Sequence, residues 1–501
     1  MRITNQMLTN TSMHNINRNK NGLSILDQQY SSGKKIQRPS EDPIVAVRAL
    51  KLRTNLSELN QYYEKNIPDA KSWMDVTESA LTNINTILTK INSSFVQGAN
   101  DPLTPSDRTS IMQNLVEYKK QIYQEGNSNY AGRYVFTGYK TDKSLVFNEN
   151  TTNLKYSITE NFTGKDIETI SKVVGSHSID EYNPLDPTNN NFKDAPTLTN
   201  TYRIRLSYDG LDNTPIDKIT YKQADGTTVE IPSATSPFTI GAPNPISKDD
   251  PAAYNPGPDS INFIAETGEL VLGANVYESM RLASDITLDY DKSKFNEGDL
   301  RPEHYFNCKA TDQYNKEYEY TKSEQHIQYE INFNQKLIVN TQGSDALVHG
   351  IGRDIDEVVA AVEEVVATEE KIAEVKKMLE DKNITPEQTE ALNALLGQLD
   401  TELVLKNKLL HDKFEQGIAG SSKHQDTINT AVADLGSRYV RLELTEDRLS
   451  TQQVDFEDLL SANEDVDIVE TFIKLSSKEA IYNASLSAAS KVIKNTLLDF
   501  I

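Results

Sequence analysis

The sequence predicts a multidomain α+β protein: elongated α-helical coiled-coil rods from both chain ends, with an inserted all-β domain and a helical hairpin. Three observations lead to this class. Apolar residues recur at heptad spacing near both ends of the 501-residue chain. From about residue 148 to 340 the apolar pattern instead alternates with period two, as in strands. From about 354 to 417 the helical period returns in two segments with a short joint, which is typical of an antiparallel helix pair.

Composition narrows the kinds of partner. The formal net charge of −23 argues against nucleic acid and against an anionic membrane surface, because both attract clustered Lys and Arg. The single cysteine, Cys308, excludes an internal disulfide framework, and we expect it to be inert packing in a strand. No apolar run approaches the ~20 residues of a membrane span. The first residues lack the apolar core of a cleavable signal peptide, so we expect any export to use another route.

The first segment is amphipathic but a poor helix former. It holds no acidic residue before Leu26 and is rich in asparagine, which disfavours an isolated helix. Four apolar residues nevertheless follow helical spacing, and they are Ile16, Leu23, Leu26 and Tyr30. We therefore predict a helix that forms only against a partner; the alternative is a disordered tail.

The motif RPSEDP then interrupts the helical pattern. Ser40 or Asp42 can cap a new helix, and Pro43 is tolerated in its first turn. The nearby Lys34 and Lys35 are expected to be solvated linker charges, with contact to an acidic neighbouring subunit as the alternative. We interpret the motif as a joint between a terminal helix and a rod, and its residues are Arg38, Pro39, Ser40, Asp42 and Pro43.

A long rod is predicted after this joint. One heptad phase continues from Val45 to Ile91, and we expect a kink at Pro68 where the phase is kept. At ~1.5 Å per residue the rod would be roughly 80 Å long. A shorter helix is expected between Thr104-Pro105 and Gly126. The stretch NYAGRYVFTGYKT then predicts a β-hairpin, with the key residues Gly132, Arg133, Tyr134, Phe136 and Gly138.

The middle of the chain is predicted to be an insertion. Asp225-Gly226 between two apolar stretches indicates a β-hairpin. After the helical pair, we expect the stretch from Gly417 to Ser422 to separate it from the C-terminal rod.

The C-terminal part mirrors the beginning. A heptad rod from Ile428 to Leu460 ends at SANEDVD, where Ser461 or Asn463 could cap the final helix. We predict that this helix packs against the first one and between subunits through Leu475, Tyr482, Leu486, Ile493 and Phe500. The predicted domains are 1–38 with 464–501, 39–147 with 418–463, 148–345, and 346–417.

Catalytic signatures are absent from the sequence. The seven histidines have no metal-ligand spacing, and there is no HExxH, Walker loop or G-x-S-x-G. Paired carboxylates such as Glu369-Glu370 are expected to be a solvated helix face. We predict no enzyme activity, no cofactor and no metal.

Five stretches together resemble the flagellin superfamily: MRITNQM, SSGKKIQRPSEDP, NYAGRYVFTGYKT, LGSRYVRLE and LLDFI. The resemblance covers roughly residues 1–147 and 424–501. Within the superfamily, RPSEDP, GRYVFTGYKT and the LLDFI ending favour the flagellar hook-associated proteins of the hook–filament junction over the filament subunit. The length of the middle and the 354–417 pair are not explained by the resemblance.

The resemblance implies a structural protein of the bacterial flagellum, exported unfolded by the flagellar secretion apparatus to the extracellular organelle. It implies a coiled-coil domain of paired termini and a variable middle that points outward. The implied partners are identical subunits in a ring, a neighbouring hook-associated protein, flagellin and an export chaperone. Two alternatives remain: a filament subunit of the flagellin type, or a coiled-coil surface adhesin unrelated to flagella.

Overall fold

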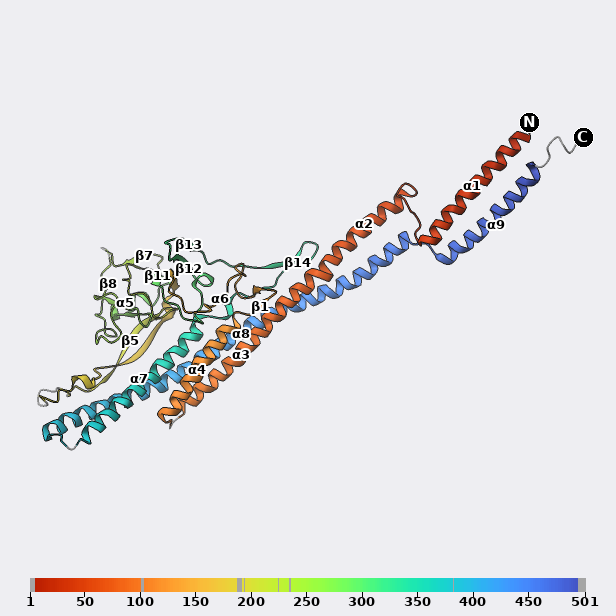
Figure 1. The fold of residues 1–501 in the computed structure, drawn as a ribbon. Helices are drawn as coiled ribbons and strands as arrows, with labels where there is room; N and C mark the ends of the chain where they lie inside the picture. The colour runs from red at the N-terminus through yellow and green to blue at the C-terminus, as the bar shows by residue number, and fades with distance from the viewer. Residues whose placement is uncertain are drawn as a thin grey trace, which may run out of the picture. The chain divides into compact units, whose positions relative to one another are not determined.

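The computed structural model describes residues 5–100, 103–186, 192, 194–223, 225–233, 236–381 and 383–493, with the backbone alone for Asn5, Val492 and Ile493. It mixes helices with several sheets, as the sequence predicts (Figure 1). The chain divides into two compact units. The terminal unit comprises Met1–Lys71, Tyr329–Leu337 and Val440–Ile501, and the central unit comprises Ser72–Gln328 and Ile338–Tyr439.

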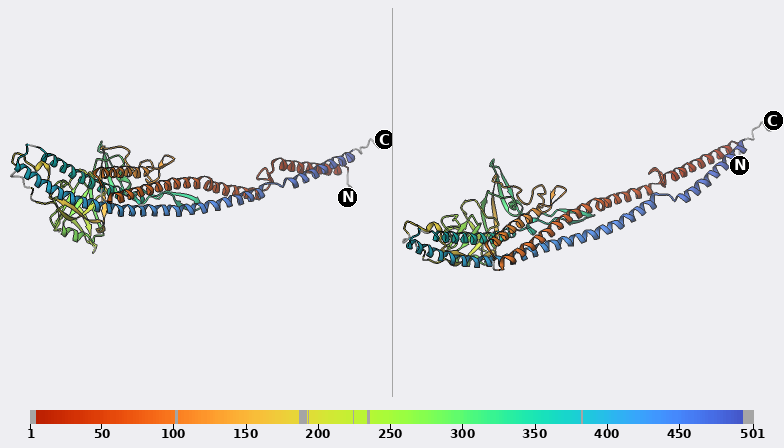
Figure 2. Two further views of the ribbon diagram at one scale, coloured as in Figure 1. Left: turned by 90° about the horizontal axis from the view of Figure 1, so that it is seen from below. Right: turned by 60° about the horizontal axis from the view of Figure 1, so that its bottom comes forward.

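Helices from both chain ends build the terminal unit. They are α1 (Asn5–Ser32), α2 (Pro43–Asn60), α9 (Ile468–Ile493), the start of α3 (Ile67–Ala99) and the end of α8 (Pro386–Glu464). Helix α1 packs beside α9, and the two views of Figure 2 agree on this pairing. The first and last described helices therefore lie together, as the mirrored apolar patterns predict.

Helix α2 begins at the RPSEDP motif. Asp42 has an extended backbone (φ −145°, ψ 98°), and its Oδ1 accepts hydrogen bonds from the amides of Ile44 at 3.0 Å and Val45 at 3.2 Å. Pro43 occupies the first helical position, where its missing N–H costs nothing. Of the two caps that the sequence allowed, Asp42 is the one used.

Just before Pro68, where a kink is expected, the structure has a π-helix over Gln61–Asn66. The amide of Ile67 bonds to the carbonyl of Tyr62, five residues earlier, instead of four. Proline cannot donate to the carbonyl four residues before it, and a local change of hydrogen-bond spacing accommodates that loss.

The predicted caps of the last helix are wrong. Helix α8 runs through Ser461 and Asn463 to Glu464, and α9 begins at Ile468. The cap is Asp467, whose Oδ1 accepts from the amides of Val469 at 2.9 Å and Glu470 at 3.0 Å. Asp467 is the last residue of SANEDVD. An N-cap residue directly precedes the first apolar residue of its helix, and Asp467 meets this rule whereas Ser461 and Asn463 do not.

A two-stranded ribbon completes the terminal unit. It consists of β14 (Gln328–Asn332) and β15 (Gln335–Ile338). Ile331 and Leu337 are buried, and the side-chain Nδ2 of Asn66 donates to the Glu330 carbonyl at 2.8 Å. The hydroxyl of Tyr329 donates to Asp69. The ribbon is therefore fixed against the helices by apolar and polar contacts.

The central unit contains both helices and strands. Besides the rest of α3 and α8, its helices are α4 (Pro105–Glu125), α5 (Ala274–Met280), α6 (Gly343–Ala346) and α7 (His349–Leu379), with 3₁₀ turns at Gly164–Asp166, Ile179–Glu181 and Pro302–His304. The predicted helix 105–125 is confirmed, and Thr104 and Asp107 form a reciprocal capping box at its start.

The described residues of the central unit form three sheets. One is the hairpin β1–β2 (Asn129–Tyr130, Arg133–Tyr134), and the strand orders of the larger sheets are β4-β5-β10-β9-β8 and β13-β12-β3-β11-β6-β7. The strands span Leu154–Phe162 (β3), Ile167–Val174 (β4), Thr197–Arg205 (β5), Ile219–Lys222 (β6), Thr228–Ile231 (β7), Thr239–Ile240 (β8), Ser260–Ile264 (β9), Glu269–Leu272 (β10), Asp285–Lys292 (β11), Asn307–Asp312 (β12) and Glu317–Tyr320 (β13). The hairpin expected around Asp225-Gly226 is confirmed, with Lys222 opposite Thr228. Cys308 is buried in β12 as expected.

The separation expected between Gly417 and Ser422 does not occur, because α8 is one helix of 79 residues. The glycines serve close packing instead of a turn. A Cβ on Gly417 would lie 3.1 Å from the ring of Phe95, and a Cβ on Gly98 would lie 2.2 Å from the ring of Phe414. Ser421 is buried and accepts a hydrogen bond from Asn92 at 2.7 Å. Small residues here let α3 and α8 approach each other.

Candidate assembly interface

Five of the predicted interface residues lie half-buried on the paired helices α1 and α9. Ile16, Leu23 and Leu26 of α1 are half-buried, as are Leu475 and Tyr482 of α9. Two contacts tie the pair together. The rings of Tyr30 and Phe472 lie 5.8 Å apart, and Asn19 Nδ2 donates to Ser485 Oγ at 3.0 Å.

The α1–α9 pair leaves much apolar surface uncovered. Tyr30 is 41% exposed and Leu486 is 42% exposed, although both are predicted interface residues. The other exposed large apolar residues of these helices are Met7, Leu8, Met13 and Ile25, and Ile468, Val469, Phe472, Ile473 and Ile481. Burial of one such side chain stabilises by roughly 1.5–3 kcal/mol. Two helices with so much free apolar surface are suited to further association. Phe500 and the side chain of Ile493 lie outside the described residues.

The chain breaks beside the pair also lie together. Lys34 and Asp465 form an antiparallel β-bridge. The Lys35 amide donates to the Glu464 carbonyl at 2.7 Å, and the Val466 amide donates to the Gly33 carbonyl at 3.0 Å. We call this paired region, residues 33–42 and 465–467, the joint.

Opposite charges meet at the joint. Lys34 Nζ lies 2.5 Å from Asp465 Oδ1 and 3.2 Å from Glu464 Oε2, and Arg53 Nη2 lies 2.7 Å from the same Glu464 oxygen. The hydrogen bond to Asp465 raises the pKa of Lys34. Burial alone would raise the pKa of Glu464, but hydrogen bonds from Arg53 and Lys34 outweigh it and lower that pKa. Lys34 is therefore not a free linker charge; its acidic partners belong to the same chain.

The other predicted motif lies in the central unit. Ala131 and Gly132 form the hairpin turn with φ values of 50° and 79°, and Arg133 lies over the Trp73 ring at 5.0 Å from its centroid. Phe136 is buried, and Tyr134 is half-buried. Gly138 has φ 61°, and a Cβ there would meet the side chain of Gln325. Arg38, Pro39, Ser40 and Pro43 are exposed in the terminal unit, where Asp42 caps α2.

Exposed apolar side chains on α2 and α8 were missed by sequence reasoning. On α2 they are Ile44, Val47 and Leu50, and on the part of α8 in the same unit they are Val440, Leu444, Val454 and Leu459. These residues fall outside the heptad phase, and apolar residues off that phase were the available signal.

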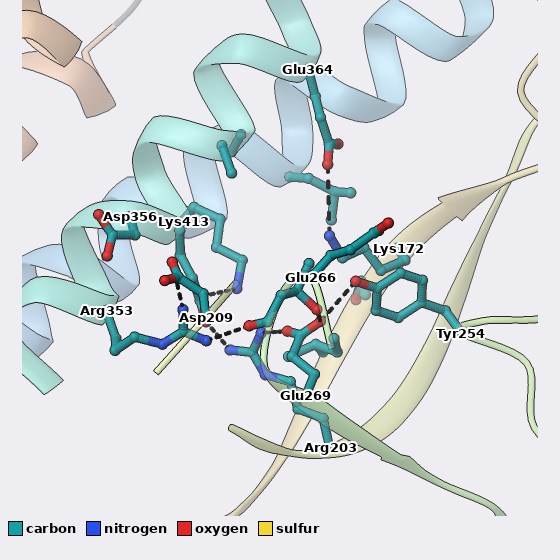
Figure 3. Close-up of a pocket in the computed structure, with 17 residues that line it drawn as sticks. Lys172, Arg203, Asp209, Tyr254, Glu266, Glu269, Arg353, Asp356, Glu364 and Lys413 are labelled. Atoms are coloured by element: carbon teal, nitrogen blue, oxygen red, sulfur yellow. Dashed lines mark hydrogen bonds and ion pairs between the residues drawn. The ribbon is translucent and has the colours of Figure 1, made fainter. Parts of the chain in front are cut away.

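The central unit contains a cavity of about 170 Å³ between its strands and helices (Figure 3). Charged side chains line it and pair with one another. The Arg203 guanidinium binds Glu168, Glu269 and Glu357, and Lys413 Nζ donates to Glu357 Oε2 at 2.7 Å. This ionic cluster links β4, β5 and β10 to α7 and α8.

A neighbouring arm of the cluster involves Arg205, Asp354 and His424. Arg205 Nη2 lies 2.7 Å from Asp354 Oδ1, and His424 Nε2 lies 2.9 Å from Asp354 Oδ2. Burial opposes ionisation of Asp354 and Glu357. The hydrogen bond from His424 and the charge of Arg205 outweigh burial and lower the pKa of Asp354, and Arg203, Lys413 and Arg205 do the same for the pKa of Glu357. Among the described residues, no group of three His, Cys, Asp or Glu side chains could hold a metal ion. The cluster is thus a salt-bridge network whose partners satisfy one another.

None of the described helices combines the length and hydrophobicity that crossing a membrane requires. Residues 3–141 match the model of the bacterial flagellin N-terminal helical region. This region includes α1, α2, α3, α4 and the β1–β2 hairpin.

Several flagellar proteins match part of the chain. The chain is 32% identical over 143 residues to flagellar hook-associated protein 3 of Salmonella typhimurium. This alignment covers 28% of this chain and 45% of that protein. The chain is 29% identical over 143 residues to the Escherichia coli protein of the same name, with the same coverage. A flagellin of Clostridium tyrobutyricum is 29% identical over 128 residues, or 26% of this chain and 34% of the relative. The chain thus matches about half the length of the first two relatives.

Solved structures of related proteins are similar only at a low level. Flagellar hook associated protein-3 from Legionella pneumophila has a TM-score of 0.28 at 11% identity, covering 82% of this chain and 96% of that one. The flagellar junction protein FlgL from Legionella pneumophila has a TM-score of 0.26 at 11% identity, covering 80% and 99%. The sequence matches confirm the resemblance of this chain to the flagellin superfamily, and within it to flagellar hook-associated protein 3.

Proposed function

We propose that this protein is a structural junction protein of the bacterial flagellum, which links hook to filament and has no catalytic role. It self-assembles through its terminal helices into a ring of identical subunits. The observation that carries this proposal is the α1–α9 pair, in which apolar residues from both chain ends lie together while others, including Leu486, are still exposed.

The proposal assigns a part to each region. Residues 1–38 and 464–501 are the terminal coiled-coil domain, which becomes stable on assembly. Residues 39–147 and 418–463 are a coiled-coil rod domain with its hairpin, 148–345 are an outer β-rich domain, and 346–417 are a helical hairpin insertion. The charge pairs at the joint, such as Lys34 with Asp465, support a defined connection between the first two parts.

The route and partners follow from the similarity to flagellar hook-associated protein 3. The subunit is exported unfolded through the flagellar secretion apparatus and acts outside the cell. Its neighbours are another hook-associated protein on one side and flagellin on the other, and an export chaperone covers the terminal helices before export. The exposed apolar residues of α1 and α9 give a chaperone a physical reason to bind them.

Substitution of Leu486 tests this assignment. A charge placed in an interface that becomes buried costs more than the lost apolar contact, and the contact repeats in every subunit. Leu486→Asp should leave the rest of the protein folded but block incorporation, so that filaments detach and flagellin accumulates in the medium. The matched control is Lys491→Asp, an exposed position on the same helix, which should have a smaller effect.

Two measurements decide the outcome: immunoblots of flagellin in the medium, and circular dichroism of the purified variant. Normal swimming with stable filaments in cells carrying Leu486→Asp would overturn the assembly role. Loss of the whole helical signal would instead place Leu486 in the core of the monomer.

The second candidate function is a flagellin-type filament subunit, because the matched N-terminal helical region is named for flagellin and a flagellin is among the relatives. Copy number separates the two functions. About one ring of copies per flagellum supports the junction role, and thousands of copies support the filament role. A coiled-coil surface adhesin would keep its function after deletion of the two terminal helices.

A further inference from the structure

The ribbon β14–β15 of the terminal unit presents an aromatic side chain at its tip. Its turn consists of Phe333 and Asn334, and Asn334 has φ 54°. Phe333 is 74% exposed, although a phenylalanine ring gains much free energy by burial. An exposed ring at the end of a hairpin is available to another molecule.

The ribbon that carries Phe333 is held in place along its length. Asn66 Nδ2 donates to the Glu330 carbonyl at 2.8 Å, and Arg448 Nη2 donates to Gln335 Oε1 at 3.1 Å. Ile331 and Leu337 are buried beside these contacts. Phe333 is therefore presented in a fixed position, which reduces the entropy lost when it binds.

The same unit contains a hole whose lining includes apolar and cationic side chains, both of which can contact an aromatic ring. It is a cavity of about 200 Å³ between the joint and α2. Half of its lining residues are apolar, and they are Ile36, Pro39, Ala46, Ala49 and Leu50. The polar half consists of Lys34, Gln37, Arg38, Arg53 and Glu464, and Arg53 is paired with Glu464.

Size and charge favour an aromatic occupant. A cavity of about 150 Å³ with an apolar lining is large enough to bind benzene, so this hole can accept a phenyl ring. Guanidinium groups bind the faces of aromatic rings, and two of them lie among the lining residues. An aliphatic side chain would gain the burial but not the cation–π contact.

Phe333 cannot fill the hole of its own chain. Hydrogen bonds place Glu330 beside Asn66, and the ring lies three residues further along the strand. With ~3.3 Å per strand residue and ~1.5 Å per helix residue, Phe333 lies roughly 15 Å or more from Ala49 along α2. A phenylalanine side chain is too short to cross that distance.

We propose that Phe333 of one copy inserts into the hole beside the joint of a neighbouring copy. The proposal rests on the self-assembly proposed above and adds a lateral contact that does not involve α1 or α9. Because knob and hole are different surfaces, the contact is heterologous, and such contacts repeat into rings or helical arrays. The inserted ring also packs against Ile36 and Pro39, so each neighbour restrains the joint of the next copy.

Cysteine cross-linking tests the contact in assembled flagella. The protein carries Asn332→Cys, next to Phe333, and Gln37→Cys, among the lining residues of the hole, so that the ring and the apolar lining are both kept. The background is Cys308→Ser, because Cys308 is the only native cysteine. Disulfides need Cα atoms within about 7 Å, so the two positions cannot bond within one chain. Mild oxidation should produce a ladder of dimers and larger oligomers, and the two single-cysteine variants should not produce it. A ladder no stronger than in these controls, or a cross-linked monomer, would overturn the proposal.

Mixing two defective variants tests the direction of the contact. Phe333→Ala removes the knob, and Leu50→Asp places a charge at the edge of the hole; each should reduce incorporation at least tenfold, given the burial of one aromatic side chain. Co-expression should restore single knob–hole pairs, since a Phe333→Ala copy keeps its hole and a Leu50→Asp copy keeps its ring. When Phe333→Ala also carries Gln37→Cys and Leu50→Asp also carries Asn332→Cys, both in the Cys308→Ser background, the cross-linked product should be a dimer without larger species.

The outcomes separate this inference from the proposed function. If Phe333→Ala assembles normally while Leu486→Asp does not, the knob contact is wrong and the assembly role stands. If both variants assemble normally, both proposals fail. Circular dichroism of Phe333→Ala confirms folding, because the exposed ring makes little contact within its own chain.

Discussion

Single residues decide where the helices of the terminal unit begin. Asp42 caps α2 through two backbone amides, whereas Ser40 of the same motif is exposed and does not cap the helix. Removal of an N-cap side chain typically costs about 0.5–2 kcal/mol. Asp42→Ala should therefore lower the free energy of unfolding by about 1 kcal/mol in urea melts of the terminal helices. Ser40→Ala serves as the control and should change it little; equal losses would show that the assigned cap is wrong.

At the same scale, Glu357 makes the ionic cluster sensitive to acid. Its folded pKa is held below the ordinary value of 4.5, because its ion pairs with Arg203, Lys413 and Arg205 outweigh burial. A carboxyl group with a lowered folded pKa stabilises the fold above its unfolded pKa, and that contribution is lost as pH falls from about 4.5 toward the folded pKa.

Glu357→Gln should therefore unfold more easily at pH 7 and should lose less stability than the parent between about pH 5 and 2. Chemical denaturation at several pH values measures the difference. The control is Glu230→Gln, because Glu230 pairs with Lys218 at the surface, where ion pairs contribute little. Parallel stability curves for Glu357→Gln and the parent would contradict the assigned role of Glu357.

At the scale of elements, two glycines in helices should respond in opposite ways to alanine. A Cβ on Gly98 of α3 would overlap the Phe414 ring of α8, whereas a Cβ on Gly397 of α8 meets nothing within 4 Å. Alanine in place of glycine in a helix stabilises by roughly 1 kcal/mol when space is available. Gly397→Ala should raise the melting temperature and Gly98→Ala should lower it. A rise for both would mean that α3 and α8 are not closely packed at this point.

These glycines also show where prediction from the sequence fails. Spacing predicted the helical segments near both ends, the capped helix 105–125 and the hairpin at Gly132, because those signals are local. The stretch from Gly417 to Ser422 has the composition of a linker, yet it is helical. Its residues are small because Phe95 and Asn92 of α3 pack closely against them. Local propensity cannot reveal a distant neighbour.

The candidate interface was predictable to a similar extent. Apolar periodicity predicted that Leu23 and Leu475 lie on helices that pair, and α1 and α9 are in contact. An amphipathic pattern is sufficient for such a prediction. It could not show that Leu486 is still exposed in the pair, or that Lys34 binds Asp465, since both depend on register between segments more than 400 residues apart. The ribbon tip at Phe333 was expected only as part of an alternating strand.

For the whole molecule, we expect the terminal helices to be the first parts attacked by protease. A pair of helices with many exposed apolar residues and few polar contacts opens more easily than a packed core. Limited proteolysis of dilute monomer should first remove residues 1 to about 38 and 464 to 501, and leave a resistant fragment identified by mass spectrometry. Assembled protein should resist the same treatment. Protection of both ends in a demonstrably monomeric sample would contradict the expectation.

The α1–α9 pair gives the molecule a means of rejecting incomplete copies. Asn19 and Ser485, which touch across the pair, are separated by 466 positions of sequence. A chain cut short by a premature stop codon or by proteolysis before Ile468 keeps α1 but lacks the helix beside which α1 lies. A binding partner that contacts both paired helices therefore requires α1 and α9 to be present in the same chain. Under the proposed function, a copy without α9 lacks the paired surface, and we expect it to be excluded from assembly.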